Sequence, residues 1–257
     1  MISNVVKQGV AIDINLNDYD PKQVQLLYEP MIVVDDKDCM LGTATKKDVH
    51  LLSNINNGLI HRAFSLFLFN SKTNELLLQQ RSPEKITYPN LWTNTCCSHP
   101  LYNDQELDGG QGIKHAVIRR VNYELGCDFL TNDDLHYLTR IYYRAENIPN
   151  DHLFGECEID YIVVAFKNFN LLTDLKPNLN EISKIKLMPL EQVEQLNEET
   201  ITPWFRMIIK SGLLKQWWKS IPNDLTNFLD EDRRFGLTSG MNPNLLFRDV
   251  GLSRDGG

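Results

Sequence analysis

The chain has 257 residues, 42% of them hydrophobic and 23% charged, which is typical of a globular protein and excludes a wholly disordered chain. Its 34 acidic residues outnumber its 26 lysines and arginines, and the net charge of −8 argues against nucleic acid or a membrane as the main partner. No apolar run reaches the roughly 20 residues that span a bilayer. Five cysteines, two of them adjacent, favour a reducing compartment. With no signal peptide or peroxisomal tripeptide visible, we expect a cytoplasmic protein.

Stretches rich in β-branched and aromatic residues predict strands. In chain order these are Met31–Val34, His61–Phe69, Glu75–Arg81, Leu135–Ala145 and Glu158–Lys167. The second and third flank the polar segment Asn70–Asn74 and are expected to form an antiparallel hairpin. The segment 82–110, rich in Pro, Asn, Asp and Gly, predicts a long irregular loop of the kind that often carries function.

Helices are predicted in the second half of the chain. Gly112–Leu125 is followed by the stop signal Gly126, and Leu190–Glu199 is a second helix. A longer helix runs from Pro203 to about Ser220, with Thr202 as its cap. We expect weak order in residues 236–257. Strands and helices alternate without a regular βαβ rhythm, which predicts an α+β fold with a mixed β-sheet packed between helices.

Two short motifs contain residue types suited to chemistry. In Asn-Thr-Cys-Cys-Ser-His-Pro, residues 94–100, a thiol and an imidazole lie two positions apart and can share one site. The alternative is a buried, inert cysteine beside a surface histidine. In the second motif, Glu156 and Glu158 lie on one face of a strand, where a divalent cation would relieve their repulsion. The alternative is that both carboxylates are solvated at a sheet edge.

Three histidines complete a candidate metal site. His50 and His61 flank a short segment before an apolar strand, and His99 belongs to the first motif. Three imidazoles with two carboxylates suit Zn, Mn or Fe better than Ca. Each histidine taken singly is more often structural or exposed than a metal ligand.

Basic residues recur near these candidates, at Lys46, Arg62, Arg81, Lys85 and Arg120. Around one pocket they would bind a diphosphate through charge-assisted hydrogen bonds, although each alone is more often a solvated surface charge. Arg120 and Glu124 share a helix face and could be only a surface ion pair. Trp204 could be an ordinary core aromatic.

Four runs of sequence together resemble one family. They are residues 61–65 (HRAFS), 92–100 (WTNTCCSHP), 155–161 (GECEIDY) and 201–205 (ITPWF). Over about Glu29 to Asn227 the chain resembles the type I isopentenyl-diphosphate isomerases, which have a Nudix-like fold, and the double cysteine resembles the eukaryotic branch. The resemblance implies that the protein interconverts isopentenyl and dimethylallyl diphosphate through a carbocation, as a step of isoprenoid biosynthesis.

The resemblance also implies roles for individual residues. The implied catalytic residues are Cys97, not Cys96, together with Glu158 and Tyr143. The implied ligands of a protein-bound divalent metal (Mg, Mn or Zn) are His50, His61, His99, Glu156 and Glu158, and Glu124 would help to hold a separate Mg²⁺. The implied substrate-binding residues are Lys46, Arg81, Lys85, Ser98, Arg120 and Trp204, the last at the hydrocarbon end.

Two other functions are weighed against the isomerase. A Nudix-type diphosphate hydrolase needs several glutamates on the helix 112–126, where only Glu124 is present. A structural zinc module would use Cys97 and His99, but the closely spaced cysteine pairs of such modules are lacking. We expect an N-terminal extension (residues 1–58) that contributes metal and diphosphate ligands, a Nudix-like catalytic domain (59–210) and a C-terminal helix with a weakly ordered tail (211–257). We also expect a monomer with a small isoprenoid diphosphate as its ligand.

Overall fold

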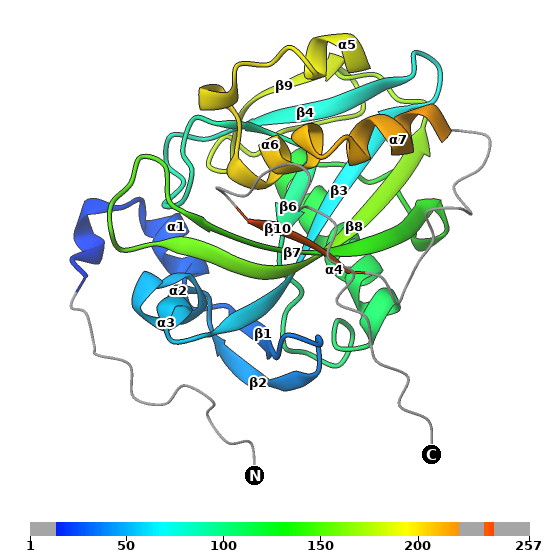
Figure 1. The fold of residues 1–257 in the computed structure, drawn as a ribbon. Coiled ribbons are helices and arrows are strands. Elements are labelled where there is room, and N and C mark those ends of the chain that lie inside the picture. Colours follow the sequence, from blue (N-terminus) through cyan, green and yellow to red (C-terminus); the bar gives the residue numbers. More distant parts are fainter. Residues whose placement is uncertain (1–13, 221–233, 239–257) are drawn as a thin grey trace, which may run out of the picture.

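A computed structural model describes residues 14–220 and 234–238, and within them ten strands form one mixed sheet (Figure 1). The strands are β1 (Pro30–Val34), β2 (Met40–Thr45), β3 (Ile60–Asn70), β4 (Glu75–Arg81), β5 (Trp92–Thr93), β6 (Cys96–Ser98), β7 (Leu135–Glu146), β8 (Gly155–Lys167), β9 (Ile182–Met188) and β10 (Arg234–Thr238). Their main order is β10-β7-β8-β3-β1-β2. Strand β4 pairs with the end of β3 and then with β5 and β9, and β6 pairs with β3.

Helices cover both faces of the sheet. The α-helices are α1 (Pro21–Leu26), α2 (Lys46–His50), α3 (Leu52–Asn56), α4 (Gly109–Leu125), α5 (Leu190–Val193), α6 (Pro203–Lys210) and α7 (Leu213–Ser220). Short 3-10 turns lie at Leu16–Asp18, Asn132–Asp134 and Glu198–Thr200. The predicted α+β architecture, a mixed sheet packed between helices, is confirmed. Among the described residues, none of the helices has the length and hydropathy that a membrane span requires.

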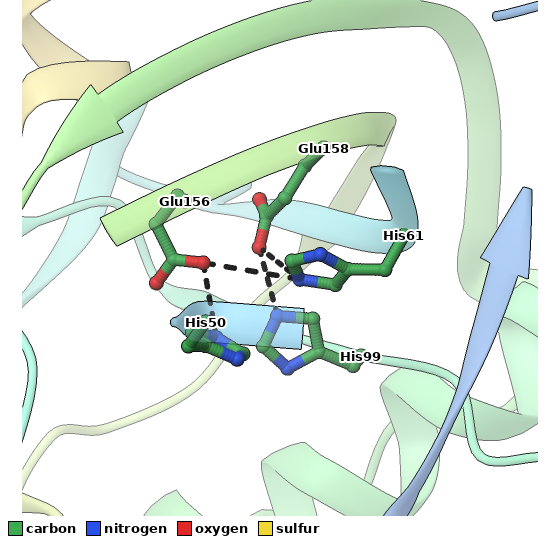
Figure 2. A group of neighbouring side chains, drawn as sticks. All are labelled: His50, His61, His99, Glu156 and Glu158. Carbon is green, nitrogen blue, oxygen red and sulfur yellow. Dashed lines mark hydrogen bonds and ion pairs between the residues drawn. The ribbon is translucent and has the colours of Figure 1, made fainter. Parts of the chain in front are cut away.

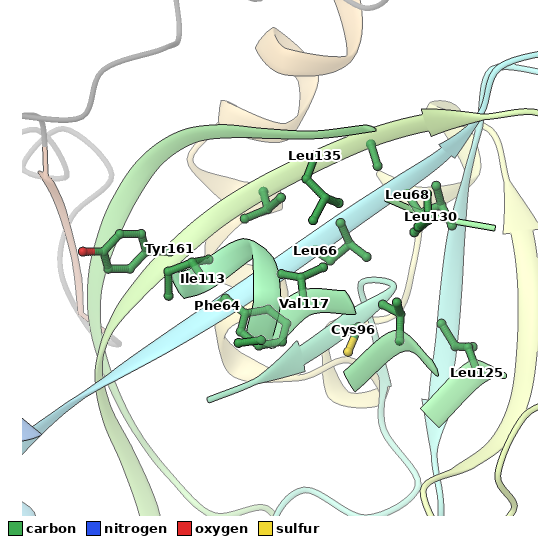
Figure 3. Close-up of a cluster of buried hydrophobic side chains, with 14 of the residues drawn as sticks. Phe64, Leu66, Leu68, Cys96, Ile113, Val117, Leu125, Leu130, Leu135 and Tyr161 are labelled. Carbon is green, nitrogen blue, oxygen red and sulfur yellow. The ribbon is translucent and has the colours of Figure 1, made fainter. Parts of the chain in front are cut away.

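The central strands β3 and β8 run parallel and bury side chains on both faces. Because side chains alternate along a strand, Phe64 and Leu66 of β3 point toward α4, where they form a core shown in Figure 3. Phe67 and Phe69 point the other way and pack with Phe205 and the other aromatic side chains of α6 and α7. The sheet therefore separates two hydrophobic layers.

The register of the strands places three predicted site residues in one row. Tyr143 of β7 lies opposite Glu158 of β8, and Glu158 lies opposite His61 of β3. Ser65, four residues further along β3, lies opposite Cys97 of β6. The row is on the face that carries α6, and this face therefore holds the site.

A buried ion network lies on the opposite face. Asp38, in the turn between β1 and β2, accepts a hydrogen bond from Arg62 Nε at 2.8 Å and one from Arg140 Nη1 at 2.9 Å. Tyr161 also donates its hydroxyl hydrogen to Asp38, and both guanidinium groups lie 5.8 Å from the centre of its ring. The turn is thereby attached to β3, β7 and β8.

The loop predicted over residues 82–110 is only partly irregular. It contains β5 and β6, and α4 begins at its end. Both strands are too short for a periodic pattern, so only their pairing with β4 and β3 defines them. The short strand β2 and strands β9 and β10 were also not predicted, and the hairpin of β3 and β4 is confirmed only near its tip, at Phe69↔Leu76 and Asn70↔Glu75.

Two helix predictions were wrong in extent. The segment 190–199 forms α5 only as far as Val193, because Asn197 caps a separate 3-10 turn by accepting from Glu199 N at 3.0 Å. The helix predicted over 203–220 is two helices, since Gly212 adopts a positive φ of +75° and ends α6. Thr202 occupies the predicted cap position, but its hydroxyl donates to Thr93 Oγ1 instead of capping α6. Of the tail expected to be weakly ordered, residues 236–238 lie in β10 and residues 239–257 lie outside the described residues.

Candidate active site and metal centre

Three histidines and two glutamates converge in a buried cluster (Figure 2). Its members are His50, His61, His99, Glu156 and Glu158. One potential ligand atom from each lies within 4.8 Å of all the others, and the three imidazole rings have centroids 4.9–5.0 Å apart. The cluster matches the predicted ligand set in full, and within the described residues no other such group is found.

Contacts inside this cluster leave several polar atoms without a hydrogen-bond partner. Glu156 Oε2 lies 3.0 Å from His50 Nε2 and 3.8 Å from His61 Nε2, yet none of these three buried atoms makes a hydrogen bond. Buried polar atoms are normally satisfied, so the arrangement of these atoms fits a ligand that they share. Nitrogen and carboxylate oxygen donors at this spacing fit a divalent metal ion.

Burial keeps two histidines of the cluster neutral, as metal ligands must be, but it opposes ionisation of Glu156. Burial, with the nearby charge of Lys46, lowers the pKa of His50 to about 4, so its imidazole is neutral. Burial also holds the pKa of His99 well below its usual value. Burial and the neighbouring Glu158 raise the pKa of Glu156 well above its usual range. The neighbouring imidazoles of His61 and His99 lower the pKa of Glu158 against the effect of its burial. A cation between the two carboxylates would remove their repulsion.

A short helix positions two of the predicted residues. Thr45 caps α2 by accepting from Asp48 N at 3.1 Å, so the helix starts at Lys46 and ends at His50. These two residues are four positions apart on one helix face, and both line the same pocket. His50 Nδ1 lies 2.7 Å from the carbonyl oxygen of Lys46, and this hydrogen bond turns Nε2 toward Glu156.

Cys97 and Cys96 point to opposite faces of β6. The Cys97 thiol donates to Asn94 Oδ1 at 2.9 Å and lies 3.2 Å from Ser65 Oγ. Cys96 is fully buried in the core under α4, where its thiol contacts Glu124 Oε2 at 3.5 Å. Burial and Asp160 raise the pKa of Cys97 to about 12, so this side chain is a neutral thiol at pH 7.

The surroundings of Cys97 fix its orientation. Trp204 Nε1 donates to Cys97 Sγ at 3.0 Å. The amide of Asn94 is held by bonds from its Nδ2 to the carbonyl oxygens of Leu66 and Cys96, so its oxygen faces the thiol. On the other side, Ser65 donates to Asp160 Oδ2 at 2.7 Å. The thiol therefore lies among polar groups that each have a defined donor or acceptor role.

Glu158 is held by both the metal cluster and a tyrosine. Its Oε1 lies 2.8 Å from His99 Nε2 and 3.1 Å from His61 Nε2, while its Oε2 accepts the hydroxyl hydrogen of Tyr143. The Tyr143 ring lies 6.1 Å from that of Trp204. These aromatic rings, with Cys97 and Glu158, line one pocket.

The same pocket is lined by four cationic side chains, Lys46, Arg81, Lys85 and Arg120. Arg81 is fixed because its Nε and Nη2 donate to the carbonyl oxygens of Tyr88 and Thr87. Burial, together with Lys85 and Arg120, lowers the pKa of Lys46 to about 8. So many cations at one place are costly without a bound anion, and the pocket is suited to a multiply charged anionic group.

Two buried carboxylates accompany these cations. Arg120 donates to Glu124 Oε1 from Nη2 at 2.5 Å, and Gln79 Nε2 donates to Glu124 Oε2 at 3.1 Å. The Arg120–Glu124 pair is therefore buried and not the surface pair considered from the sequence. The second carboxylate, Glu181, contacts Lys85 and Arg120.

All the predicted site residues except His61 and Glu124 line this pocket, and these two lie directly behind it through Glu158 and Arg120. Arg62, the remaining basic candidate, lies instead in the Asp38 network. The polar residues that sequence reasoning missed are Ser65, Asn94, Asp160 and Glu181. Asp160 lies two positions after Glu158 on β8, so strand alternation could have identified it, whereas Asn94 lies in the bend between β5 and β6 and Glu181 precedes β9, and neither has such a signal.

Comparison with known proteins agrees with this geometry. A NUDIX domain model matches residues 59–208. The chain is 45% identical over 231 residues to isopentenyl-diphosphate delta-isomerase 1 of Mesocricetus auratus, covering 86% of this chain and 97% of that protein. It is 44% identical over 226 residues to an isopentenyl-diphosphate delta-isomerase of Gibberella zeae, covering 84% and 86%.

A solved structure shares the fold at low sequence identity. The Deinococcus radiodurans protein DR0079 superimposes with a TM-score of 0.50 and 17% identity, covering 71% of this chain and 98% of that one. The predicted Nudix-like fold is thus confirmed. From the matched domain and the two relatives, the chain belongs to the NUDIX superfamily and, within it, to the isopentenyl-diphosphate isomerase family.

Proposed function

We propose that this protein interconverts isopentenyl diphosphate and dimethylallyl diphosphate. The observation that carries the proposal is one pocket in which a thiol, Cys97, and a carboxylate, Glu158, lie beside a group of cations. The relatives, named as isopentenyl-diphosphate isomerases, favour this reaction over hydrolysis. The protein is accordingly an isomerase of isoprenoid biosynthesis.

Cys97 and Glu158 are the proposed acid–base pair. Moving an unactivated double bond requires a proton to be added at one carbon and another to be removed from a second carbon. A tertiary carbocation develops between these steps, and two proton-exchanging side chains suffice. Tyr143, whose hydroxyl donates to Glu158, orients the carboxylate and stabilises its negative charge. The hydrogen bond from Trp204 to the sulfur of Cys97 likewise fixes the thiol.

Trp204 has a further role in the proposed reaction. Its indole ring lines the pocket beside Cys97, so the π face can stabilise the developing carbocation by about 2 kcal/mol when desolvated. Trp204 and Tyr143 also exclude water from the pocket, which prevents water from adding to the carbocation and forming an alcohol.

The cationic end of the pocket is the proposed diphosphate site. Lys46, Arg81, Lys85 and Arg120 would bind the phosphate oxygens, together with Ser98, which also lines the pocket. Binding energy from the charged group positions the small hydrocarbon, which offers few contacts of its own.

Two metal ions belong to the proposal. The histidine–glutamate cluster would hold one divalent ion (Mg, Mn or Zn), and Glu124 would hold Mg²⁺ together with the diphosphate. When bound, the first ion supplies positive charge that keeps Glu156 and Glu158 ionised, and the second neutralises the diphosphate. We also propose that residues 1–58 form an extension that contributes Lys46 and His50 to a catalytic domain of residues 59–210 and a C-terminal segment of 211–257. A monomeric, cytoplasmic enzyme is the expected form.

The test follows both alkenes and free phosphate. Purified protein is incubated with isopentenyl diphosphate, with and without a chelator, and proton NMR measures dimethylallyl diphosphate while a colorimetric assay measures phosphate. We expect metal-dependent isomerisation without phosphate release, because the helix that carries Glu124 lacks the other glutamates of a hydrolase. A nucleoside diphosphate derivative serves as the hydrolase control. Phosphate release at a rate equal to or above isomerisation would overturn the proposal.

A further inference from the structure

Glu181 is a buried carboxylate at the cationic end of the pocket, and it has a partner at each oxygen. It immediately precedes β9 and is 1% exposed. Its Oε2 lies 2.5 Å from Lys85 Nζ and 3.4 Å from Arg120 Nη2. Its Oε1 accepts from Gln23 Nε2 of α1 at 3.0 Å. One side chain thus joins two pocket cations to the N-terminal helix.

The backbone around Glu181 is fixed independently of these side-chain contacts. Ser82 N donates to the carbonyl oxygen of Glu181 at 2.9 Å, which ties the start of the Lys85 loop to this residue. Asn178 N donates to the carbonyl oxygen of Glu124 at 2.8 Å, at the end of α4. The backbone of Glu181 is therefore fixed relative to the loop that carries Lys85 and to helix α4, which carries Arg120.

A negative charge at this place needs a reason, because it opposes binding of an anion. A lysine has a flexible four-carbon stem, and a free ammonium would occupy many positions. Fixing Lys85 and Arg120 before the ligand arrives removes the entropic cost of ordering them during binding. The ammonium has three donors, so the bond to Glu181 leaves others for phosphate oxygens.

We infer that Glu181 is a positioning residue for the diphosphate site, which holds Lys85 and Arg120 in place and couples them to α1 through Gln23. This inference rests on the proposed function and deepens it by one residue. If only the net charge of the pocket mattered, removing the Glu181 carboxylate would strengthen the binding of an anion. If Glu181 instead holds Lys85 and Arg120 in place, removing its carboxylate weakens the binding of the anion.

The test compares Glu181→Gln and Glu181→Asp with a matched control, Glu84→Gln. Glu84 is an exposed acid next to Lys85, so its substitution removes the same charge nearby without touching the pocket. For Glu181→Gln we expect the KM for isopentenyl diphosphate and the inhibition constant of inorganic diphosphate to rise about 10- to 100-fold, the range for loss of charged hydrogen bonds, while kcat changes less than about 5-fold. Glu181→Asp should recover part of the loss, and Glu84→Gln should match the wild type.

Two further measurements, of metal content and of diphosphate affinity, accompany the kinetic comparison. Metal content of the histidine–glutamate cluster should be unchanged in Glu181→Gln, since that site lies elsewhere in the pocket. An unchanged or lower KM would overturn the inference, and if Glu181→Gln does not fold, a wild-type KM in Glu181→Asp overturns it instead. Calorimetric titration with inorganic diphosphate and Mg²⁺ separates the two proposals, because it reports on Glu181 even if no isomerisation occurs. Equal affinity of wild type and variant in that titration would also refute positioning.

Discussion

Substitution of the two adjacent cysteines is expected to have very different effects. Cys97 and Cys96 differ by one position in β6, so strand alternation sends one thiol into the pocket and the other into the core under α4. We predict that Cys97→Ala lowers kcat by at least about 10²- to 10⁴-fold, the contribution of a general acid or base. Cys96→Ala should keep most of the activity.

The cost of Cys96→Ala should appear in stability instead. Its side chain is fully buried, so removing the sulfur loses about 0.8 kcal/mol of transfer free energy for a group of methylene size, plus a cavity term. A total of about 1–2 kcal/mol corresponds to a Tm lower by roughly 2–8 °C in a domain of this size. Cys97 is partly exposed, so its substitution should change Tm less.

The assay is steady-state isomerisation by proton NMR, combined with thermal unfolding by circular dichroism and elemental analysis of bound metal. Both variants must retain the wild-type metal content for the comparison to hold. Similar losses of kcat in the two folded variants would refute the assignment of Cys97. Retention of more than about a hundredth of the activity in Cys97→Ala would refute it as well.

Three other predictions follow from the pocket. His61→Ala and Glu156→Gln should lower the metal content per chain in elemental analysis, and unchanged stoichiometry in both would show that they are not ligands. Trp204→Leu should reduce kcat roughly 10- to 30-fold, from about 2 kcal/mol of cation–π stabilisation, and Trp204→Phe less; equal kcat values for the two would contradict the role of the ring. Although burial alone would raise it, the charges of Lys85 and the neighbouring cations lower the pKa of Glu181 to about 2. Its carboxylate then stabilises the fold above pH 4.5 and loses this effect as pH falls toward 2, by on the order of 3 kcal/mol. The difference in free energy of unfolding between wild type and Glu181→Gln, from urea titrations, should shrink over that pH range, and a constant difference would exclude the ion pair.

The residues alone predicted part of the candidate site, because Cys97, His99, Glu156 and Glu158 lie in two compact motifs, and the resemblance supplied the roles of the others. Alternation along β8 correctly placed Glu156 and Glu158 on one face. The convergence of His50 and His99 on them came only from the resemblance, because it depends on pairings between distant segments. The register that aligns Tyr143 with Glu158 is likewise a property of strand pairing, which no local pattern specifies.

The errors have local causes that can be named. Gly212, which divides the long C-terminal helix, was visible in the sequence, but glycine is tolerated inside helices often enough to be passed over. Strands β5 and β6 are two and three residues long, below the length at which alternation can be recognised. Glu181 lies in an irregular segment, and its role can be inferred only from its contacts with Lys85 and Arg120, which are distant in sequence.

The Asp38 network has a consequence for residues that it never touches. Strands β7, β8 and β3 carry Tyr143, Glu158 and His61 on one face, and the partners of Asp38 are side chains of the same three strands on the other. The Asp38 network thus holds these three strands together from the face opposite the pocket. Its hydrogen bonds do not involve any residue of the pocket. The register of these three strands therefore does not depend only on packing at the pocket face. A substitution of Asp38, in a turn on the face opposite the pocket, would then change the spacing of Tyr143, Glu158 and His61.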